Sequence, residues 1–150
     1  MATLFLVPMN TDDRWADLVA LDEEFLKGGV VLSELCSIII RDADIAFVHG
    51  AYLSAIFSAV SGVETYLRAE YSTGGRQRLT DLIDQAPLLT DLKTDLHRLR
   101  KYRNRWVHVN SPWDDCEVLE NSDEVAHELA EIAFFAMTVL RRTIYENPAI

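Results

Sequence analysis

Apolar residues recur at intervals of three and four along most of this chain, which is the spacing of one face of an α-helix. One such series runs from Val30 to Val48 and another from Ala51 to Tyr71. The 150 residues include only 6 Gly and 4 Pro, and this shortage of turn-forming residues disfavours a protein of many short strands. The sequence therefore predicts an all-α fold.

Cap and turn residues divide the chain into helices. Asn10 and Thr11 are N-cap candidates at the first start, Gly28-Gly29 marks a break, and an acidic loop is expected from Trp113 to Asn121. After the first helix, the predicted helices are Val30–Val48, Ala51–Tyr71, Leu79–Ala86, Leu88–His108 and Ser122–Tyr145, the last capped by Ser122. We expect residues 1–150 to form one domain, an antiparallel bundle of four to five helices.

The segment from Ile45 to Val63 has no Asp, Glu, Lys or Arg, so a membrane-spanning helix has to be considered for it. It contains His49 and several serines and glycines, and a buried helix of a soluble bundle explains it better than a membrane span. Cys36 and Cys116 have no metal-ligand spacing, and Cys36 lies among apolar residues as a core thiol. We expect a cytoplasmic protein without metal or cofactor.

Charge is distributed very unevenly along the chain. The net charge of −10 excludes a protein that binds nucleic acid through its overall charge. Residues 93–108, however, hold 6 basic and 1 acidic side chains, so this segment is +5 and the remainder is −15. The basic residues are Lys93, Arg98, Arg100, Lys101, Arg103 and Arg105, interleaved with Tyr102 and Trp106. They form either a solvated helix face or a local anion-binding site.

Two charged residues interrupt apolar helix faces. With Leu92 at zero on an ideal helix, Arg103 lies at about 20°, on the face formed by Leu89, Leu92, Leu96, Leu99, Trp106 and Val107. Glu64 likewise interrupts the face formed by Leu53, Phe57, Val60, Leu67 and Tyr71. A buried charge is costly unless it is paired. We therefore expect Glu64 to pair with Arg103, either to fix helix register or to hold Arg103 in a functional site.

Asn104 and His108 are four residues apart and share a helix face. His108 lies about 140° from Arg103 on an ideal helix. The two side chains can meet if the helix loosens near Val107–Asn110, if the length of Arg103 compensates, or if a second subunit completes the site. The other histidines carry less weight: we expect a turn or core role for His49 and a solvent-facing side chain for His97.

Arg103, Asn104 and His108, placed near the end of a long helix, resemble the R-x(4–6)-H motif of HEPN domains (higher eukaryotes and prokaryotes nucleotide-binding). The preceding helix pair, whose second member reads GAYLSAIFSAVSGVETYLRAEY, also resembles the HEPN bundle, and the resemblance spans about residues 27–146. It implies a HEPN-like fold and a metal-independent endoribonuclease, a hydrolase class that includes toxins of toxin–antitoxin systems and phage-defence effectors. It also implies a homodimer with the two motifs facing across the interface.

The resemblance assigns roles to individual residues. His108 would act as general acid/base, Arg103 would stabilise the transition state, and Asn104 would orient the phosphate or the histidine. The RNA's own 2′-OH would attack. Asn110 stands where one toxin subgroup has a tyrosine that its antitoxin modifies, so that regulation is not expected here. The remaining cations of the basic helix that we expect to contact RNA are Arg98, Arg100, Lys101 and Arg105.

Two other functions stay open from the sequence. One is a catalytically silent HEPN bundle that serves as a dimerisation or protein-binding module. The other is an acidic antitoxin or immunity-like protein that masks a basic partner. The acidity of the chain favours these two functions. The segment after His108, residues 109–150 with a charge of −7, would either repel RNA or form a surface that a cognate antitoxin or regulator recognises.

Overall fold

A computed structural model of the chain describes residues 10–108 and 120–146. These residues form six helices and no β-strand, which confirms the all-α prediction; the predicted count of four to five helices is too low. The helices are α1 (Thr11–Phe25), α2 (Glu34–Val48), α3 (Tyr52–Tyr71), α4 (Leu79–Gln85), α5 (Thr90–Val107) and α7 (Ser122–Tyr145). Asn110, Cys116 and most of the predicted acidic loop lie outside the described residues.

Capping side chains fix two of the helix starts. Asn10 Oδ1 accepts the backbone N–H of Asp13 at 3.3 Å, which confirms Asn10 as the N-cap of α1. Ser33 Oγ accepts a backbone N–H in the same way at 3.1 Å, so α2 begins after Ser33 and the predicted start at Val30 is wrong. Asn121 occupies the N-cap position of α7 without a side-chain cap bond, and Ser122 is the first helical residue rather than the cap.

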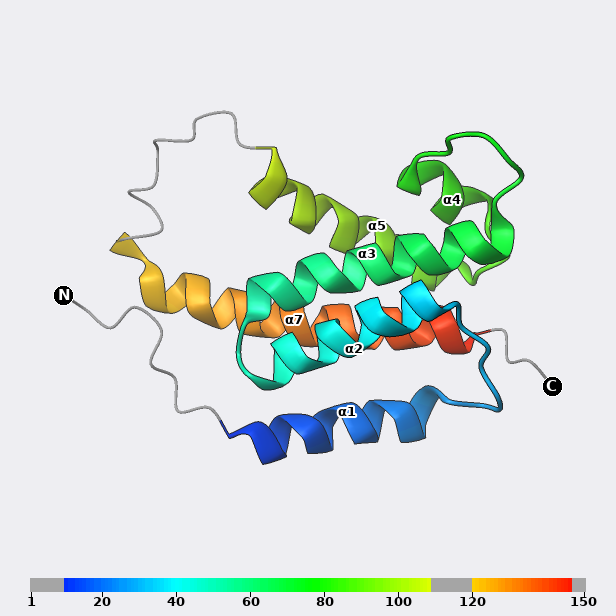
Figure 1. Cartoon of the computed structure of the whole chain (residues 1–150). Helices are drawn as coiled ribbons and strands as arrows, with labels where there is room; N and C mark the ends of the chain where they lie inside the picture. The colour runs from blue at the N-terminus through cyan, green and yellow to red at the C-terminus, as the bar shows by residue number, and fades with distance from the viewer. Residues whose placement is uncertain (1–9, 109–119, 147–150) are drawn as a thin grey trace.

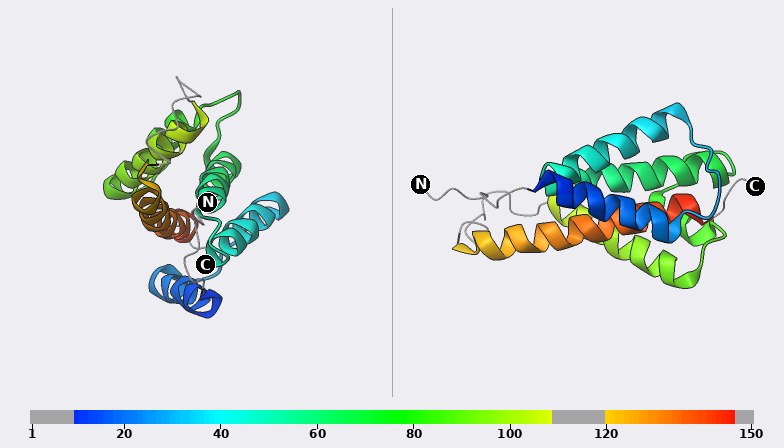
Figure 2. Two further views of the ribbon diagram at one scale, coloured as in Figure 1. Left: turned by 90° about the vertical axis from the view of Figure 1, so that its left-hand side faces the viewer. Right: turned by 90° about the horizontal axis from the view of Figure 1, so that it is seen from below.

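Helix α3 lies at the centre of the bundle and packs mainly against α2 and α7 (Figure 1). Helix α1 lies against α2 and α7 on one side, and α4 and α5 lie on the other side (Figures 1 and 2). Successive long helices reverse direction, so α1, α3 and α7 run one way while α2 and α5 run the other (Figure 1). The largest fully buried side chains include Ile56, Leu67, Leu82, Leu92, Leu99, Met137 and Leu140.

A turn divides the uncharged segment from Ile45 to Val63. Helix α2 ends at Val48 and α3 begins at Tyr52, and Gly50 between them has a φ of 76°, a backbone conformation that glycine adopts without steric cost. Buried faces of both helices account for the apolar composition, as the sequence predicted. Within the described residues, no helix has the length and apolar character needed to cross a membrane.

A buried ionic network joins α1, α2 and α7. The guanidinium of Arg141, whose side chain is 4% exposed, contacts Asp22 Oδ1 at 2.8 Å and both carboxylate oxygens of Asp44 at 3.0 Å. Tyr145 donates its hydroxyl to Asp22 at 2.7 Å. Burial raises the pKa of Asp44, although Arg141 acts to lower it. Because the network ties three helices together, it fixes how α1 sits on the bundle.

The other sequence expectation for the core concerned Cys36. Its side chain is 1% exposed, and burial raises the pKa of its thiol. The prediction of a core thiol is therefore confirmed.

Candidate functional site

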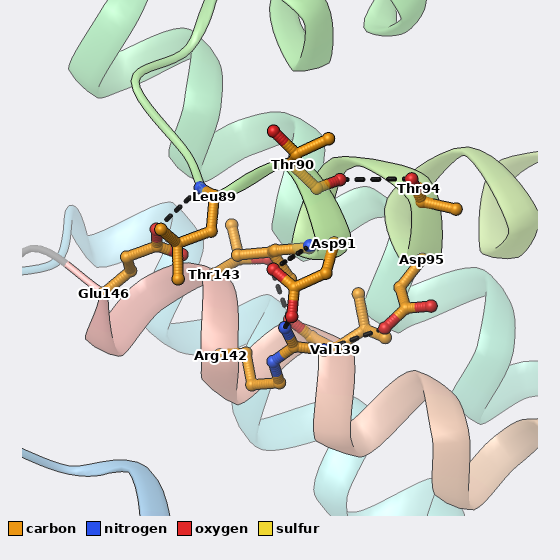
Figure 3. A network of polar contacts seen from close by, with 10 residues as sticks. Leu89, Thr90, Asp91, Thr94, Asp95, Val139, Arg142, Thr143 and Glu146 are labelled. Carbon is orange, nitrogen blue, oxygen red and sulfur yellow. Dashed lines mark hydrogen bonds and ion pairs between the residues drawn. The ribbon is translucent and has the colours of Figure 1, made fainter.

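The first turns of α5 are tied to the end of α7 (Figure 3). Arg142 contacts Asp95 at 2.8 Å and Asp91 at 3.2 Å, and Glu146 accepts the backbone N–H of Leu89 at 2.9 Å. Both acids of α5 are thus engaged by an arginine of another helix. The second half of α5 carries only basic charged residues, so positive charge concentrates toward its C-terminal end.

The apolar face of α5 is shorter than predicted. Its buried side chains are Leu92, Leu96, Leu99 and Tyr102. Leu89 is 64% exposed and Val107 is 52% exposed, so both predicted edges of the stripe are wrong. Trp106 is half-buried against the core. Helix α5 rises away from α3 toward its C-terminal end (Figure 1), and its last turn therefore has less of the bundle to pack against.

Arg103 lies in this diverging part of α5 and is half-buried. Its Nε donates to Asn104 Oδ1 at 3.0 Å. The predicted pair with Glu64 is wrong, because Glu64 instead contacts Arg68 at 2.8 Å, with both side chains more than a third exposed. Glu64 and Arg68 are four residues apart on one helix and meet without crossing between helices. Arg68 also donates to the backbone oxygen of Gln77 at 3.1 Å.

His108 marks the point where α5 ends. Its φ of −108° and ψ of 79° lie outside helical values, and its backbone N–H donates to the oxygen of Asn104 at 2.9 Å. The side chain is exposed. Helix α5 therefore keeps its regular bonding up to His108, and most of the segment Val107–Asn110, where loosening was one of three ways for His108 to meet Arg103, lies at or beyond the helix end. Within the described part of the chain no hydrogen bond joins the His108 imidazole to Arg103 or Asn104, so His108 is a neighbour of that pair rather than its hydrogen-bonded partner.

Three of the predicted RNA-contacting cations line a groove between α5 and α7. The Arg98 guanidinium lies 4.5 Å from the ring centre of Phe135, and that of Arg105 lies 5.1 Å from the ring centre of Tyr102. Lys101 lines the same groove. The fourth cation, Arg100, is half-buried, and its Nε is buried without a hydrogen-bond partner among the described residues.

Helix α7 supplies the other wall of this groove, which the sequence interpretation missed. Glu128, Ile132 and Phe135 line it, and their spacing of four and three places them on one helix face. Glu128 accepts the Tyr102 hydroxyl at 3.1 Å and lies 3.7 Å from Arg105. Burial raises the pKa of Tyr102, with Trp106 lowering it and Glu128 raising it. The spacing of Glu128, Ile132 and Phe135 in the sequence already indicated a shared helix face. Nothing in the sequence indicated which helix that face would contact.

Two other histidines can be compared with their predicted positions. His97 Nε2 is 2.7 Å from Asp84, and its side chain is 23% exposed, so it faces solvent only in part. His49 is exposed in the turn after α2, which confirms its turn role. In residues 10–108 and 120–146, no three His, Cys, Asp or Glu side chains are grouped so as to hold a metal ion.

Comparison with known proteins gives no relative for this chain: no protein-family model, curated protein or solved structure matches it. The functional argument therefore depends on the residues and their geometry.

Proposed function

We propose that this chain is a HEPN-type, metal-independent endoribonuclease of the toxin or phage-defence kind, acting as a homodimer. The observation that carries the proposal is the end of α5. There the Arg103 side chain is hydrogen-bonded to Asn104 at 3.0 Å, and exposed His108 follows where the helix stops. Arg103 and Asn104 are thus joined by a hydrogen bond, and His108 follows them at the end of the same basic helix.

The reaction needs no group that the chain lacks. The ribose 2′-OH attacks the adjacent phosphorus, the bond to the 5′-oxygen breaks, and the products are a 2′,3′-cyclic phosphate and a 5′-OH. His108 removes the proton from the 2′-OH or supplies one to the leaving oxygen. In a dimer with facing motifs, two copies of His108 provide one base and one acid.

Arg103 suits the stabilisation of charge on the phosphorane-like transition state. Its Nε donates to Asn104, which restrains the guanidinium, and no partner among the described residues contacts its two terminal nitrogens, which can therefore face phosphate oxygens. Asn104 is thus a positioning residue for Arg103, a more specific role than the one inferred from the sequence. Glu64 forms its ion pair with Arg68 rather than with Arg103, so we assign Glu64 no part in the reaction.

A second function has a specific observation in its favour. Helix α2 exposes Leu35, Ile38 and Ile45, at 62%, 48% and 41% of their surfaces. Exposed apolar side chains on one helix favour a protein-binding or dimerisation module, whether catalytically silent or combined with the nuclease. This apolar surface of α2, or an acidic surface elsewhere on the chain, could also bind a cognate antitoxin or regulator.

The test is cleavage of mixed RNA by the purified chain in EDTA at several salt concentrations. We expect cleavage by the wild-type chain and its loss in His108→Ala. His127→Ala is the matched control, since His127 is exposed on α7 with Glu131 3.0 Å away, and it should retain full activity. Intact RNA with the wild-type chain at every salt concentration would refute the nuclease, and equal cleavage by all three proteins would indicate a contaminant.

A further inference from the structure

An open groove between α5 and α7 is lined by basic and aromatic side chains. It encloses about 370 Å³, within the usual range of ligand pockets. A second hollow of about 630 Å³ adjoins it along α5 and shares Arg98 and Lys101 with it. The residues that line the first hollow are Arg98, Leu99, Lys101, Tyr102, Arg105, Glu128, Ile132 and Phe135.

Cations and flat apolar surfaces alternate in this groove. Arg98 lies over Phe135 and Arg105 lies over Tyr102, while Leu99 and Ile132 add aliphatic lining. Glu128 is the only carboxylate among the described residues that line it, and its oxygens already face Tyr102 and Arg105. Guanidinium groups over aromatic rings provide both a charge for phosphate and a planar surface for a base.

The positions of the cations point toward His108. Arg98, Lys101 and Arg105 are spaced by three and four, and the next position three residues on is His108. Residues at this spacing form one stripe along a helix. From Arg98 to His108 the stripe is about 15 Å long at the usual helical rise. A strand bound along it would therefore reach the histidine.

We propose that the α5–α7 groove binds single-stranded RNA, with phosphates at Arg98, Lys101 and Arg105 and an unpaired base stacked on the Arg98 guanidinium, which itself lies over Phe135. This inference rests on the proposed function, because it supplies the path by which RNA reaches His108. Unpaired RNA fits better than duplex, since a duplex keeps its base faces stacked inside and cannot offer one to the Arg98–Phe135 stack. An acidic peptide could bind the cations, but it has no nucleobase to stack in the groove.

The experiment measures binding separately from cleavage. A fluorescently labelled, unstructured 12-nucleotide RNA and the same sequence as a duplex are titrated by anisotropy at several salt concentrations, using His108→Ala as the background. Arg98→Ala with Lys101→Ala is compared with Arg41→Ala with Arg76→Ala, which removes two exposed positive charges elsewhere. Lys101→Glu alone is the second test variant, in case loss of the Arg98–Phe135 contact impairs folding.

We expect the groove variant to reduce the slope of log affinity against log salt by about 1.4, at roughly 0.7 per phosphate contact, which corresponds to about 25-fold weaker binding near 0.1 M salt. Lys101→Glu should reduce the slope by about 0.7 or more. The control pair should leave the slope unchanged, and the duplex should bind more weakly than the single strand.

Equal salt slopes for the groove variant and the control pair would overturn the inference, as would equal binding of duplex and single strand. So would binding of poly-glutamate, lost in the groove variant, without binding of RNA. The two proposals fail separately. If the wild-type chain cleaves RNA while the groove variant binds normally, the groove is wrong and the nuclease stands; if the chain binds RNA through the groove without cleaving it, the reverse holds.

Discussion

Arg141 offers the sharpest test of what holds the bundle together. Replacing Arg141 with Met keeps most of the side chain's apolar volume and removes a guanidinium that contacts Asp22 at 2.8 Å and Asp44 at 3.0 Å. Asp44, with an 18% exposed side chain, then has no cation against it. Removing one partner of a buried ion pair costs about 3–5 kcal/mol. We expect the free energy of unfolding to fall by about that amount.

The neighbouring residue provides the control. Arg142 also contacts two carboxylates; its own side chain is 20% exposed, but those of Asp91 and Asp95 are 73% and 33% exposed. Ion pairs that reach solvent contribute about 0–1 kcal/mol each, so Arg142→Met should cost about 1–2 kcal/mol. Urea unfolding followed by circular dichroism measures both variants. Equal losses for Arg141→Met and Arg142→Met would refute the claim that burial makes the Arg141 network costly to break.

The effect of Arg141→Met should also depend on pH. Burial raises the pKa of Asp44 in the native chain, and loss of the Arg141 charge removes a contribution that lowers it. A carboxyl whose folded pKa lies above the unfolded value of about 3.9 stabilises the fold fully below that value and loses this contribution as pH rises. The destabilisation should therefore be larger at pH 7 than at pH 4. A loss that does not change with pH would contradict this assignment of the charge.

Three further predictions follow from burial. Burial raises the pKa of Tyr66 and Tyr145, so stability present below the unfolded value of about 10 should be lost as pH rises above it; titration of all five tyrosines near pH 10 with unchanged circular dichroism would contradict this. In a Cys116→Ser variant, Cys36 should react with a thiol reagent only on unfolding, and rapid reaction in buffer would show that it is accessible. Glu64→Gln should change the free energy of unfolding by less than about 1 kcal/mol, since its ion pair is partly exposed; a loss of several kcal/mol would restore the pairing expected from the sequence.

Local signals in the sequence located most of the helices, although the start of α2 lies four residues beyond its predicted position. The Gly50 turn and the apolar spacing predicted where α3 and α7 begin and end to within one residue. They failed where packing decides. The apolar stripe predicted for α5 extends to Val107 because helical periodicity does not show where the neighbouring helices end. Helix α5 diverges from the bundle before that residue, and Val107 is exposed.

The same principle was applied to the wrong pair of charges. A charged residue on an apolar stripe indicates a buried ion pair, and Arg103 with Glu64 met that description. The pair that is buried is Arg141 with Asp44, on faces where Met137 and Phe47 are also buried. Spacing along one helix cannot show which helix lies opposite, and for Glu64 an arginine on its own helix was nearer.

The candidate site was predictable in part. The positions of Arg103, Asn104 and His108 near a helix end could be inferred, and α5 does end at His108. The bond from Arg103 to Asn104 and the contribution of Phe135 to the groove could not be. The first depends on side-chain rotamers, and the second depends on how α5 and α7 face each other.

The measurement that tests the nuclease most directly is the chemistry of the ends it produces. RNA is digested in EDTA, and the fragments are analysed by mass spectrometry and by kinase labelling without prior dephosphorylation. Attack by the 2′-OH predicts 2′,3′-cyclic phosphates and 5′-hydroxyl ends that accept label directly, and neither product should form with His108→Ala. Fragments with 5′-phosphate and 3′-hydroxyl ends, or cyclic phosphates at the same rate from the variant, would contradict the role given to His108.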